Sequence, residues 1–330
     1  MKRTTLFLII FLLLGAAATW YLLSKPDEKT SLAGADRRFK VENTDDIYKI
    51  FLADRRGAKT TLERKDGYWL YNGKYTARPN AMDNLLDAIS RVEIQYKPPT
   101  AAVKNMITSL ATEGIKVEIY NKSNKLLKSY YVGGATADEL GTYMIIEGAE
   151  QPYVASIPGW VGNLRFRYNL TGDDWRDKTV FGEKFENIQS ASVEYPKNRN
   201  LSFRLEREGK TYHITPFYET TPLIRRPYKA GSAERYLEGF RSLGAEAFEN
   251  ENPKRDSIQR LVPFSIISLK TTAGKEKMVR LFPLMTDSDQ VERYLADVNG
   301  TDFMLVQQLV FGKILWGYDF FFEEKGKEIQ

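Results

Sequence analysis

An almost unbroken apolar run extends from Leu6 to Leu23 and limits the environments in which the start of this chain can be placed. Its length of about 18 residues corresponds to roughly 27 Å of helix, close to the hydrocarbon thickness of a bilayer. The run predicts a transmembrane anchor within residues 1–24, followed by a polar tether over residues 25–36. The lipid bilayer is therefore a predicted partner, contacted by Leu6, Phe7, Leu14, Trp20, Tyr21 and Leu23.

A cleaved signal peptide is the alternative interpretation of this run, because Ala16–Ala18 offers a small-residue cleavage site. Trp20 and Tyr21 favour a retained anchor, since aromatic rings are enriched where a helix leaves the membrane. Lys2 and Arg3 precede the run and hold the start of the chain in the cytoplasm. Both interpretations predict that the remaining body lies outside the cytoplasm.

The chain contains no cysteine, which excludes disulfides, iron–sulfur clusters and thiolate zinc sites. A eukaryotic exported domain of this size ordinarily carries disulfides, so we expect a single-pass protein of the bacterial inner membrane with a periplasmic body. The net charge of +5 is too small to indicate nucleic-acid binding. Aromatic residues make up 13% of the chain, which suits a β-rich body. We predict no cofactor and no nucleic-acid partner, and the oligomeric state stays open.

Apolar periodicity predicts a first α+β unit over residues 37–172. Strands are predicted at Ile47–Leu52, Lys59–Arg64, Ile115–Ile119, Leu126–Val132, Thr142–Glu147 and Tyr153–Ile157. Helices are predicted from Pro79 to Val92, from a Thr100 cap to Leu110, and over Gly159–Tyr168. Gly133-Gly134 is interpreted as a left-handed turn between strands, because no helix follows it as a phosphate loop requires.

The same order of elements begins again at Ile188 and predicts a second unit over residues 188–322. One constant offset places Leu85 on Tyr236 and Tyr143 on Tyr294. An irregular stretch is predicted over Pro216–Pro227. A helix capped by Ser232 is predicted to follow it over Ser232–Leu243, and a short second helix over Ile258–Val262. We therefore predict two tandem, duplicated α+β units with antiparallel sheets and helices on one face, although any α+β chain resembles itself at some offset. Residues 173–187 are the predicted connection and residues 323–330 a polar tail.

Several short segments resemble an uncharacterised bacterial family, catalogued as domain of unknown function 4340. They are Phe39-Lys40-Val41, Ile47-Tyr48-Lys49-Ile50, Leu62–Trp69, the helix over Ala81–Val92, and Gly133–Thr136 with Thr142-Tyr143. The resemblance covers most of residues 37–320. It implies an accessory role in the envelope, since some members are encoded beside ABC-type transport or gliding-motility components. It implies no catalytic residue.

Catalytic constellations are missing from the sequence. His213 is the only histidine, and no Gly-x-Ser-x-Gly elbow accompanies it, so neither a serine triad nor a histidine-rich metal site is predicted. Asp173-Asp174 and Asp287–Asp289 lack the ligand spacing of a calcium loop. We predict no enzyme; a hydrolase built on paired carboxylates remains an alternative because carboxylates are plentiful.

Aromatic and guanidinium side chains gather near the join of the two units and form a candidate interaction surface, because these residue types dominate interface hot spots. The candidates are Trp160, Arg165, Arg167, Trp175 and Arg176, with Arg225 and Arg226 in the irregular stretch. The alternative is that the tryptophans fill the cores and the arginines are solvated.

These observations predict a non-catalytic, membrane-anchored accessory protein with a membrane or envelope protein as its partner. The alternative is a module that binds a glycan or another envelope polymer through aromatic faces. That alternative predicts a concave surface that exposes several of Trp69, Tyr131, Trp160 and Trp175.

Overall fold

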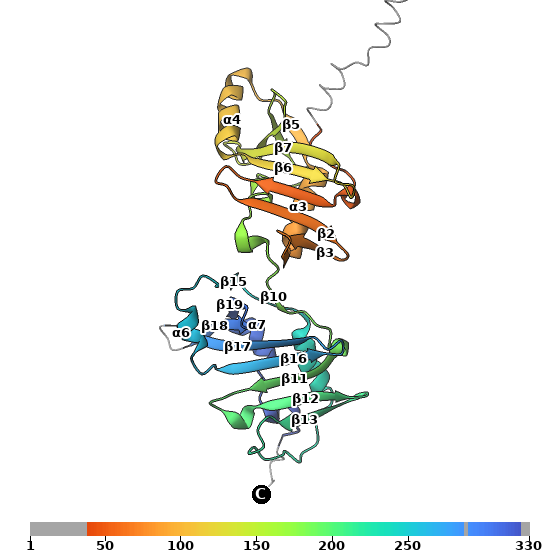
Figure 1. The fold of residues 1–330 in the computed structure, drawn as a ribbon, viewed down its shortest axis with the longest axis vertical. Helices are drawn as coiled ribbons and strands as arrows, with labels where there is room; N and C mark the ends of the chain where they lie inside the picture. The colour runs from red at the N-terminus through yellow and green to blue at the C-terminus, as the bar shows by residue number, and fades with distance from the viewer. Residues whose placement is uncertain (1–37, 287–289, 325–330) are drawn as a thin grey trace, which may run out of the picture. The chain divides into compact units, whose positions relative to one another are not determined.

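A computed structural model describes residues 38–286 and 290–324. The predicted anchor, residues 1–24, and the predicted tether, residues 25–36, lie outside the described residues. Within those described ranges, no helix combines the length and apolar character needed to cross a membrane. The chain folds into two compact units that divide between Asp177 and Lys178 (Figure 1). Both consist mainly of antiparallel sheet with a few helices, which confirms the α+β class.

The first unit is built on one antiparallel sheet with the strand order β4-β3-β2-β1-β6-β7-β8-β9-β5. Its strands are β1 (Lys49–Ala53), β2 (Lys59–Lys65), β3 (Tyr68–Tyr71), β4 (Tyr75–Thr76), β5 (Glu93–Tyr96), β6 (Ile115–Tyr120), β7 (Leu126–Ala135), β8 (Thr142–Ile146) and β9 (Tyr153–Ser156). Its helices are α3 (Pro79–Arg91) and α4 (Thr100–Glu113), with 3₁₀ turns η1 (Thr44–Asp46), η2 (Arg165–Arg167) and η3 (Gly172–Trp175).

Helix α3 covers one face of the first sheet. Pro79 starts the helix where no backbone N–H is needed. Its buried stripe follows the predicted helical spacing and consists of Ala81, Met82, Leu85, Ala88 and Ile89. These side chains share a core with alternate strand residues such as Ile50, Val117 and Tyr130. Because strand side chains alternate, the residues between them point to the opposite face, which we call the outer face.

The second unit has an antiparallel sheet with the strand order β13-β12-β11-β16-β17-β18-β19-β15, and β10 pairs separately with β14. Its strands are β10 (Thr179–Phe181), β11 (Ile188–Glu194), β12 (Phe203–Glu208), β13 (Thr211–Pro216), β14 (Leu243–Gly244), β15 (Ala247–Phe248), β16 (Ser265–Thr271), β17 (Glu276–Met285), β18 (Val291–Val298) and β19 (Asp302–Gln307). Its helical elements are α5 (Ser232–Glu238), α6 (Arg255–Gln259), α7 (Gln308–Phe311), η4 (Phe185–Asn187), η5 (Arg199–Leu201), η6 (Gly239–Arg241), η7 (Gly312–Ile314) and η8 (Tyr318–Phe321).

Several contacts recur in the two units at matching places. The Nζ of Lys128 on β7 donates to the carbonyl of Arg38 (2.8 Å), and the Nζ of Lys277 on β17 donates to that of Val180 (2.6 Å). A buried phenylalanine follows each carbonyl, Phe39 in one unit and Phe181 in the other.

A second recurring contact ties an arginine to a 3₁₀ turn. Arg64 on β2 donates to carbonyls of Thr44 and Ile47, around η1, and lies over the ring of Trp69. Arg207 on β12 donates in the same way to carbonyls of Phe185 and Glu186 in η4, and lies over the ring of Tyr212. The recurrence therefore extends from strand order to individual side chains.

Glycine accounts for two places where the sequence-based prediction is wrong. Gly133 and Gly134 lie inside β7 instead of forming a left-handed turn. Helix α4 packs so close there that a Cβ on Gly133 would lie 2.9 Å from Cδ2 of Leu110. The helix predicted over Gly159–Tyr168 is only the short turn η2, because Gly159 (φ 78°) and Gly162 (φ 127°) adopt conformations that no helix contains.

The predicted helix caps also differ from the structure. Pro99 and Gly231 occupy the N-cap positions of α4 and α5, so Thr100 and Ser232 are the first helical residues. The hydroxyl of Ser232 instead donates to the carbonyl of Phe321 (3.3 Å). The predicted second helix of this unit begins earlier than expected and forms α6.

Candidate binding groove on the second sheet

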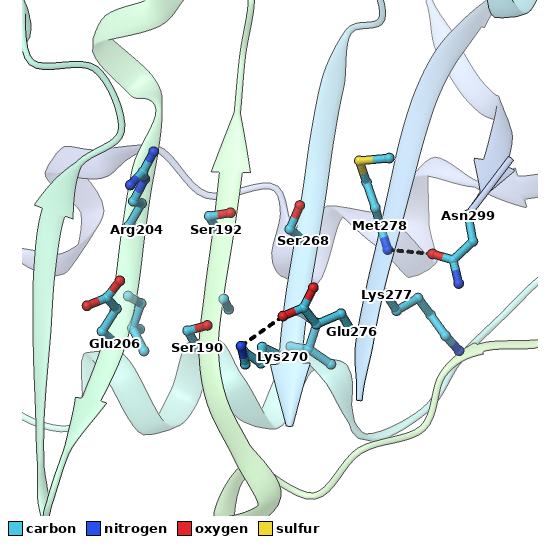
Figure 2. Close-up of a pocket in the computed structure, with 13 residues that line it drawn as sticks. Ser190, Ser192, Arg204, Glu206, Ser268, Lys270, Glu276, Lys277, Met278 and Asn299 are labelled. Carbon is cyan, nitrogen blue, oxygen red and sulfur yellow. Dashed lines mark hydrogen bonds and ion pairs between the residues drawn. The ribbon is translucent and has the colours of Figure 1, made fainter. Parts of the chain in front are cut away.

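A groove of about 530 Å³ lies on the outer face of the second sheet, across β12, β11, β16 and β17 (Figure 2). Alternation along the strands determines which residues line it. Ala191, Leu205 and Leu269 point into the hydrophobic core, so their neighbours point outward. On the two middle strands the outward residues include three serines, Ser190, Ser192 and Ser268, whose short side chains leave the hollow.

Longer side chains form the two walls of the groove. Arg204 and Glu206 on β12 stand opposite Ser192 and Ser190 in the sheet register. Across the groove, Met278 stands opposite Ser268 and is 45% exposed. The outer face at this point combines hydroxyl, charged and thioether groups.

An ion pair closes one end of the groove. The Nζ of Lys270 lies 2.8 Å from Oε1 of Glu276, which stands opposite it on β17. The hydrogen bond between them raises the pKa of Lys270 and lowers the pKa of Glu276. Both side chains are largely exposed, so the pair contributes little to stability and stays accessible to a ligand.

Most polar groups of the groove lack partners within the described residues. The hydroxyls of Ser190, Ser192 and Ser268 make no hydrogen bond there, and the carboxylate of Glu206 makes no ion pair. Arg204 makes no ion pair within the same residues, and its guanidinium lies 4.5 Å from the centre of the Phe217 ring. Within the described residues, the groove therefore offers a ligand one cation and one anion without an ion-pair partner and three hydroxyls without a hydrogen bond.

The outer face of the first sheet is closed at the corresponding place. The Nζ of Lys116 lies 2.8 Å from Glu118 and 2.9 Å from Glu147. Tyr120 donates to Glu118 (2.6 Å), and Ser129 donates to Glu147 (2.6 Å). This network, Lys116 with Glu118, Tyr120, Ser129 and Glu147, is called the lysine network below.

The lysine network shifts the pKa values of its members. Hydrogen bonds from Lys116 and then Tyr120 lower the pKa of Glu118, while those from Ser129 and then Lys116 lower that of Glu147. The hydrogen bonds that Lys116 donates to Glu118 and Glu147 raise its pKa above the ordinary value. Every polar side chain here has a partner, so this face offers a ligand little that is free.

Three residues of the predicted interaction surface have internal partners. Trp175 is fully buried, and its Nε1 donates to the carbonyl of Leu170 (2.7 Å). Arg176 is 6% exposed, pairs with Asp173 and lies 3.9 Å from the centre of the Tyr75 ring.

Arg167 is 7% exposed and its Nη1 lies 2.5 Å from Oδ2 of Asp87. Burial alone would raise the pKa of Asp87, but hydrogen bonds from Arg167 and Arg91 lower it. Arg167 therefore holds part of the first unit together.

The other predicted residues are spread over separate segments. Trp160 is half-buried, and its ring centre lies 5.6 Å from that of Phe166. The guanidinium carbon of Arg167 lies 4.9 Å from the Trp160 ring centre, so the two predicted residues Trp160 and Arg167 are in contact. Arg165 donates to the carbonyl of Glu113 (2.7 Å) at the end of α4 and lines a pocket of about 410 Å³ with Arg55 and Arg56.

In the second unit, Arg225 is exposed, and Arg226 donates to the carbonyl of Glu323. Both lie between β13 and α5. The four rings proposed for glycan binding do not share one surface, since Trp69 and Trp160 pack against the first core, Trp175 lies inside it, and Tyr131 lies on the outer face.

His213 lies at the edge strand β13 and is 56% exposed at its side chain. Its Nε2 lies 2.7 Å from Oε2 of Glu208, and it stands opposite Glu206 in the register. Within the described ranges, no hydroxyl is hydrogen-bonded to this imidazole and no group of three acidic or histidine side chains is placed to hold a metal. The arrangement makes the histidine a surface partner of Glu208.

Sequence reasoning missed the groove, although a signal for it exists. On strands β11 and β16, serines alternate with the core-facing residues. On β12, the outward positions carry long charged side chains instead. Small polar residues on two strands become adjacent only if those strands pair. The pairing of Ser192 with Ser268 brings the two together.

The fold and the groove define a two-unit α+β protein with a polar hollow on the outer face of one sheet. A family model described as Domain of unknown function (DUF4340) matches residues 69–260, and the chain belongs to that family. The match runs from β3 in the first unit to the end of α6 in the second, which confirms the resemblance noted in the sequence. No curated protein and no solved structure matches this chain.

Proposed function

We propose that this protein is a non-catalytic, single-pass accessory protein of the bacterial envelope, anchored in the inner membrane, whose second unit binds a partner protein through the groove. The observation that carries the proposal is the set of polar groups around Ser192 and Ser268 that have no partner in the described part of the chain, at a place where the first unit has the lysine network.

The occupant that fits is an extended segment of a partner that carries one acidic and one basic side chain. Arg204 and Glu206 stand side by side along β12 without ion-pair partners within the described residues, so a segment with both charges complements them. The serine hydroxyls both donate and accept, which suits backbone amides. A component of an ABC-type transport or gliding system is the partner class that the family resemblance suggests.

We also propose that the two units are duplicated copies. The common strand order, the lysines Lys128 and Lys277, and the arginines Arg64 and Arg207 support this proposal. A duplication explains why one copy can specialise for binding while the other keeps a closed face.

Site-specific photo-crosslinking in cells tests the groove. Benzoylphenylalanine placed at Met278, on the groove wall, is expected to give a defined adduct with an envelope protein. The matched control is Tyr68 on β3, which is 46% exposed against 45% for Met278. We expect Ser192→Phe to reduce the Met278 adduct about tenfold by filling the groove, and Thr61→Phe on the outer face of the first sheet to leave it unchanged. Equal adducts from both positions, or none at Met278, would contradict the proposal.

The anchor has a separate test. Protease treatment of spheroplasts is expected to digest the body while the segment preceding it stays protected, and mass spectrometry of the mature chain is expected to find the first residues present. A mature chain that starts after Ala18 would refute a retained anchor without touching the groove.

A further inference from the structure

A second pocket in the second unit, independent of the groove, combines aromatic rings with cations. It has a volume of about 370 Å³ and is lined by Lys229, Ala230, Ser232, Arg235, Trp316 and Phe320. Trp316 and Phe320 come from the segments around η8, Arg235 from α5 and Lys229 from the loop before it. The proposed function uses none of these residues.

The two rings lie side by side, and Trp316 is the one held in place by its neighbours. Trp316 packs against Tyr236 (5.5 Å between ring centres) and Phe321 (5.4 Å), and its carbonyl accepts a hydrogen bond from Tyr195 (3.0 Å). Phe320 lies 6.1 Å from Trp316 with the rings inclined at 40°, and it is 60% exposed. An exposed phenylalanine beside an immobilised tryptophan presents ring faces to solvent without a need for rearrangement.

The two cations beside the rings have no partner within the described residues. The side chains of Lys229 and Arg235 make no ion pair and no hydrogen bond there, and no acidic side chain lines the pocket. The backbone N–H of Lys229 donates to the carbonyl of Phe321 (2.8 Å), which fixes where its side chain starts. The pocket is thus positively charged and includes a guanidinium able to bind a carboxylate through two parallel hydrogen bonds.

We propose that this pocket binds an acidic saccharide, a sugar ring that carries a carboxylate. Aromatic faces stack on the C–H side of a sugar ring, while Lys229 and Arg235 neutralise the acid group. A neutral sugar would leave the charges of Lys229 and Arg235 without a counter-charge, so it fits the pocket less well. A bare anion fits less well because it gains nothing from the exposed ring of Phe320. The volume lies at the lower end of small-molecule sites, about 300–1,000 Å³, and accommodates a terminal or single sugar unit better than a long chain segment.

Titration of the full-length protein in detergent tests the proposal. The probes are trigalacturonate, its neutral counterpart galactotriose, and inorganic phosphate, with binding followed by calorimetry and by tryptophan fluorescence. We expect trigalacturonate to bind at least about tenfold more tightly than the other two. Equal affinities for trigalacturonate and galactotriose would overturn the role of the cations. Phosphate binding as tight as trigalacturonate would reduce the pocket to an anion site, and no binding of trigalacturonate would refute the proposal.

Two variants and two matched controls locate the site. Phe320→Ala and Arg235→Gln change exposed side chains and are each expected to weaken trigalacturonate binding about tenfold. Tyr68→Ala and Arg260→Gln remove an exposed ring and an exposed guanidinium elsewhere and are expected to change nothing. Equal effects of all four variants would place the binding outside this pocket. Because the Met278 adduct reports on the groove alone, the two proposals can fail separately.

Discussion

The outer faces of the two sheets have matching strands but different side chains. Ile50 pairs with Leu62 and Ile119 in the first unit, and Ala191 pairs with Leu205 and Leu269 in the second, which aligns the two registers. One residue further along, Phe51 faces Glu118 where Ser192 faces Ser268. A phenylalanine and a glutamate cover the first sheet, whereas two serines leave the second one hollow.

The comparison shows that the groove arises from side-chain length and not from topology. Both sheets bury an equivalent core on the opposite face, and both keep a helix at one end of the outer face. In the first unit α4 packs over Gly133 through Leu110, and in the second Ile258 of α6 packs against Phe282 and Phe303. Between these ends, a few positions decide whether the face is closed or open.

The two faces also differ in how they hold charge. The lysine network of the first unit remains in contact with solvent, since the side chains of Lys116 and Glu147 are 29% and 40% exposed. In the second unit Arg280 donates to Asp297, whose side chain is only 1% exposed, and to the carbonyl of Gln259 (3.1 Å). A buried carboxylate tolerates the loss of its cation less well than a solvated one does, so removing the cation should destabilise the second unit more than the first.

The largest effect is expected from Arg280→Met. It leaves the carboxylate of Asp297 buried without its cation and should lower the free energy of unfolding of the second unit by about 3–5 kcal/mol. Hydrogen exchange followed by mass spectrometry on peptides from β17 and β18 measures this unit separately, which a two-unit chain requires.

The double variant Arg280→Met with Asp297→Val is the control for this prediction, because it removes both charges. We expect it to recover most of the lost stability, since buried ion pairs are often replaceable by apolar side chains. A single variant as stable as the wild type would show that the two faces do not differ in this respect.

A smaller effect is expected from Lys116→Met in the first unit. Glu118 and Glu147 then lose their common cation, and the free energy of unfolding should fall by about 1–2 kcal/mol, discounted for the exposure of Glu147. Hydrogen exchange in peptides from β6 and β7 measures this loss of stability. Lys270→Gln is the matched control in the groove, where the exposed pair with Glu276 should give no measurable change.

The third prediction is the pH dependence of the stability lost in Lys116→Met. The pKa values of Glu118 and Glu147 are lowered by folding, so their contribution is complete above the ordinary value of 4.5 and is lost as the pH falls through the lowered values. The difference in stability between wild type and Lys116→Met should therefore be largest near pH 7 and shrink below pH 4.5. Urea-dependent hydrogen exchange in peptides from β6 and β7 at pH 7 and pH 3.5 measures this difference, and a difference that grows in acid would contradict the assignment.

Strands and the long amphipathic helix followed from the sequence because they depend on local periodicity. The stripe through Met82, Leu85 and Ile89 is visible without any partner, and it forms α3 as predicted. The role of a glycine depends on contacts that are not local. Gly133 looked like a turn residue, but its smallness serves the approach of Leu110, which is distant along the chain.

The candidate sites followed from the sequence much less well, because they depend on strand pairing. Ser192 and Ser268 are far apart along the chain, and only the register makes them neighbours. Arg167 and Trp175, two residues of the predicted interaction surface, have partners within the first unit. Residue type alone does not reveal whether a guanidinium already has a partner.

The smallest expected effect compares one serine from each outer face. Ser129 donates to Glu147 (2.6 Å), and Ser129→Ala should cost about 1 kcal/mol because the hydrogen bond to a carboxylate is lost. Ser268 makes no hydrogen bond within the described residues, so Ser268→Ala should change stability by less than about 0.5 kcal/mol. Peptide-level exchange on β7 and β16 resolves the two. If Ser268→Ala costs as much as Ser129→Ala, the hydroxyl is held by the fold, and the groove loses the free donor on which its assignment depends.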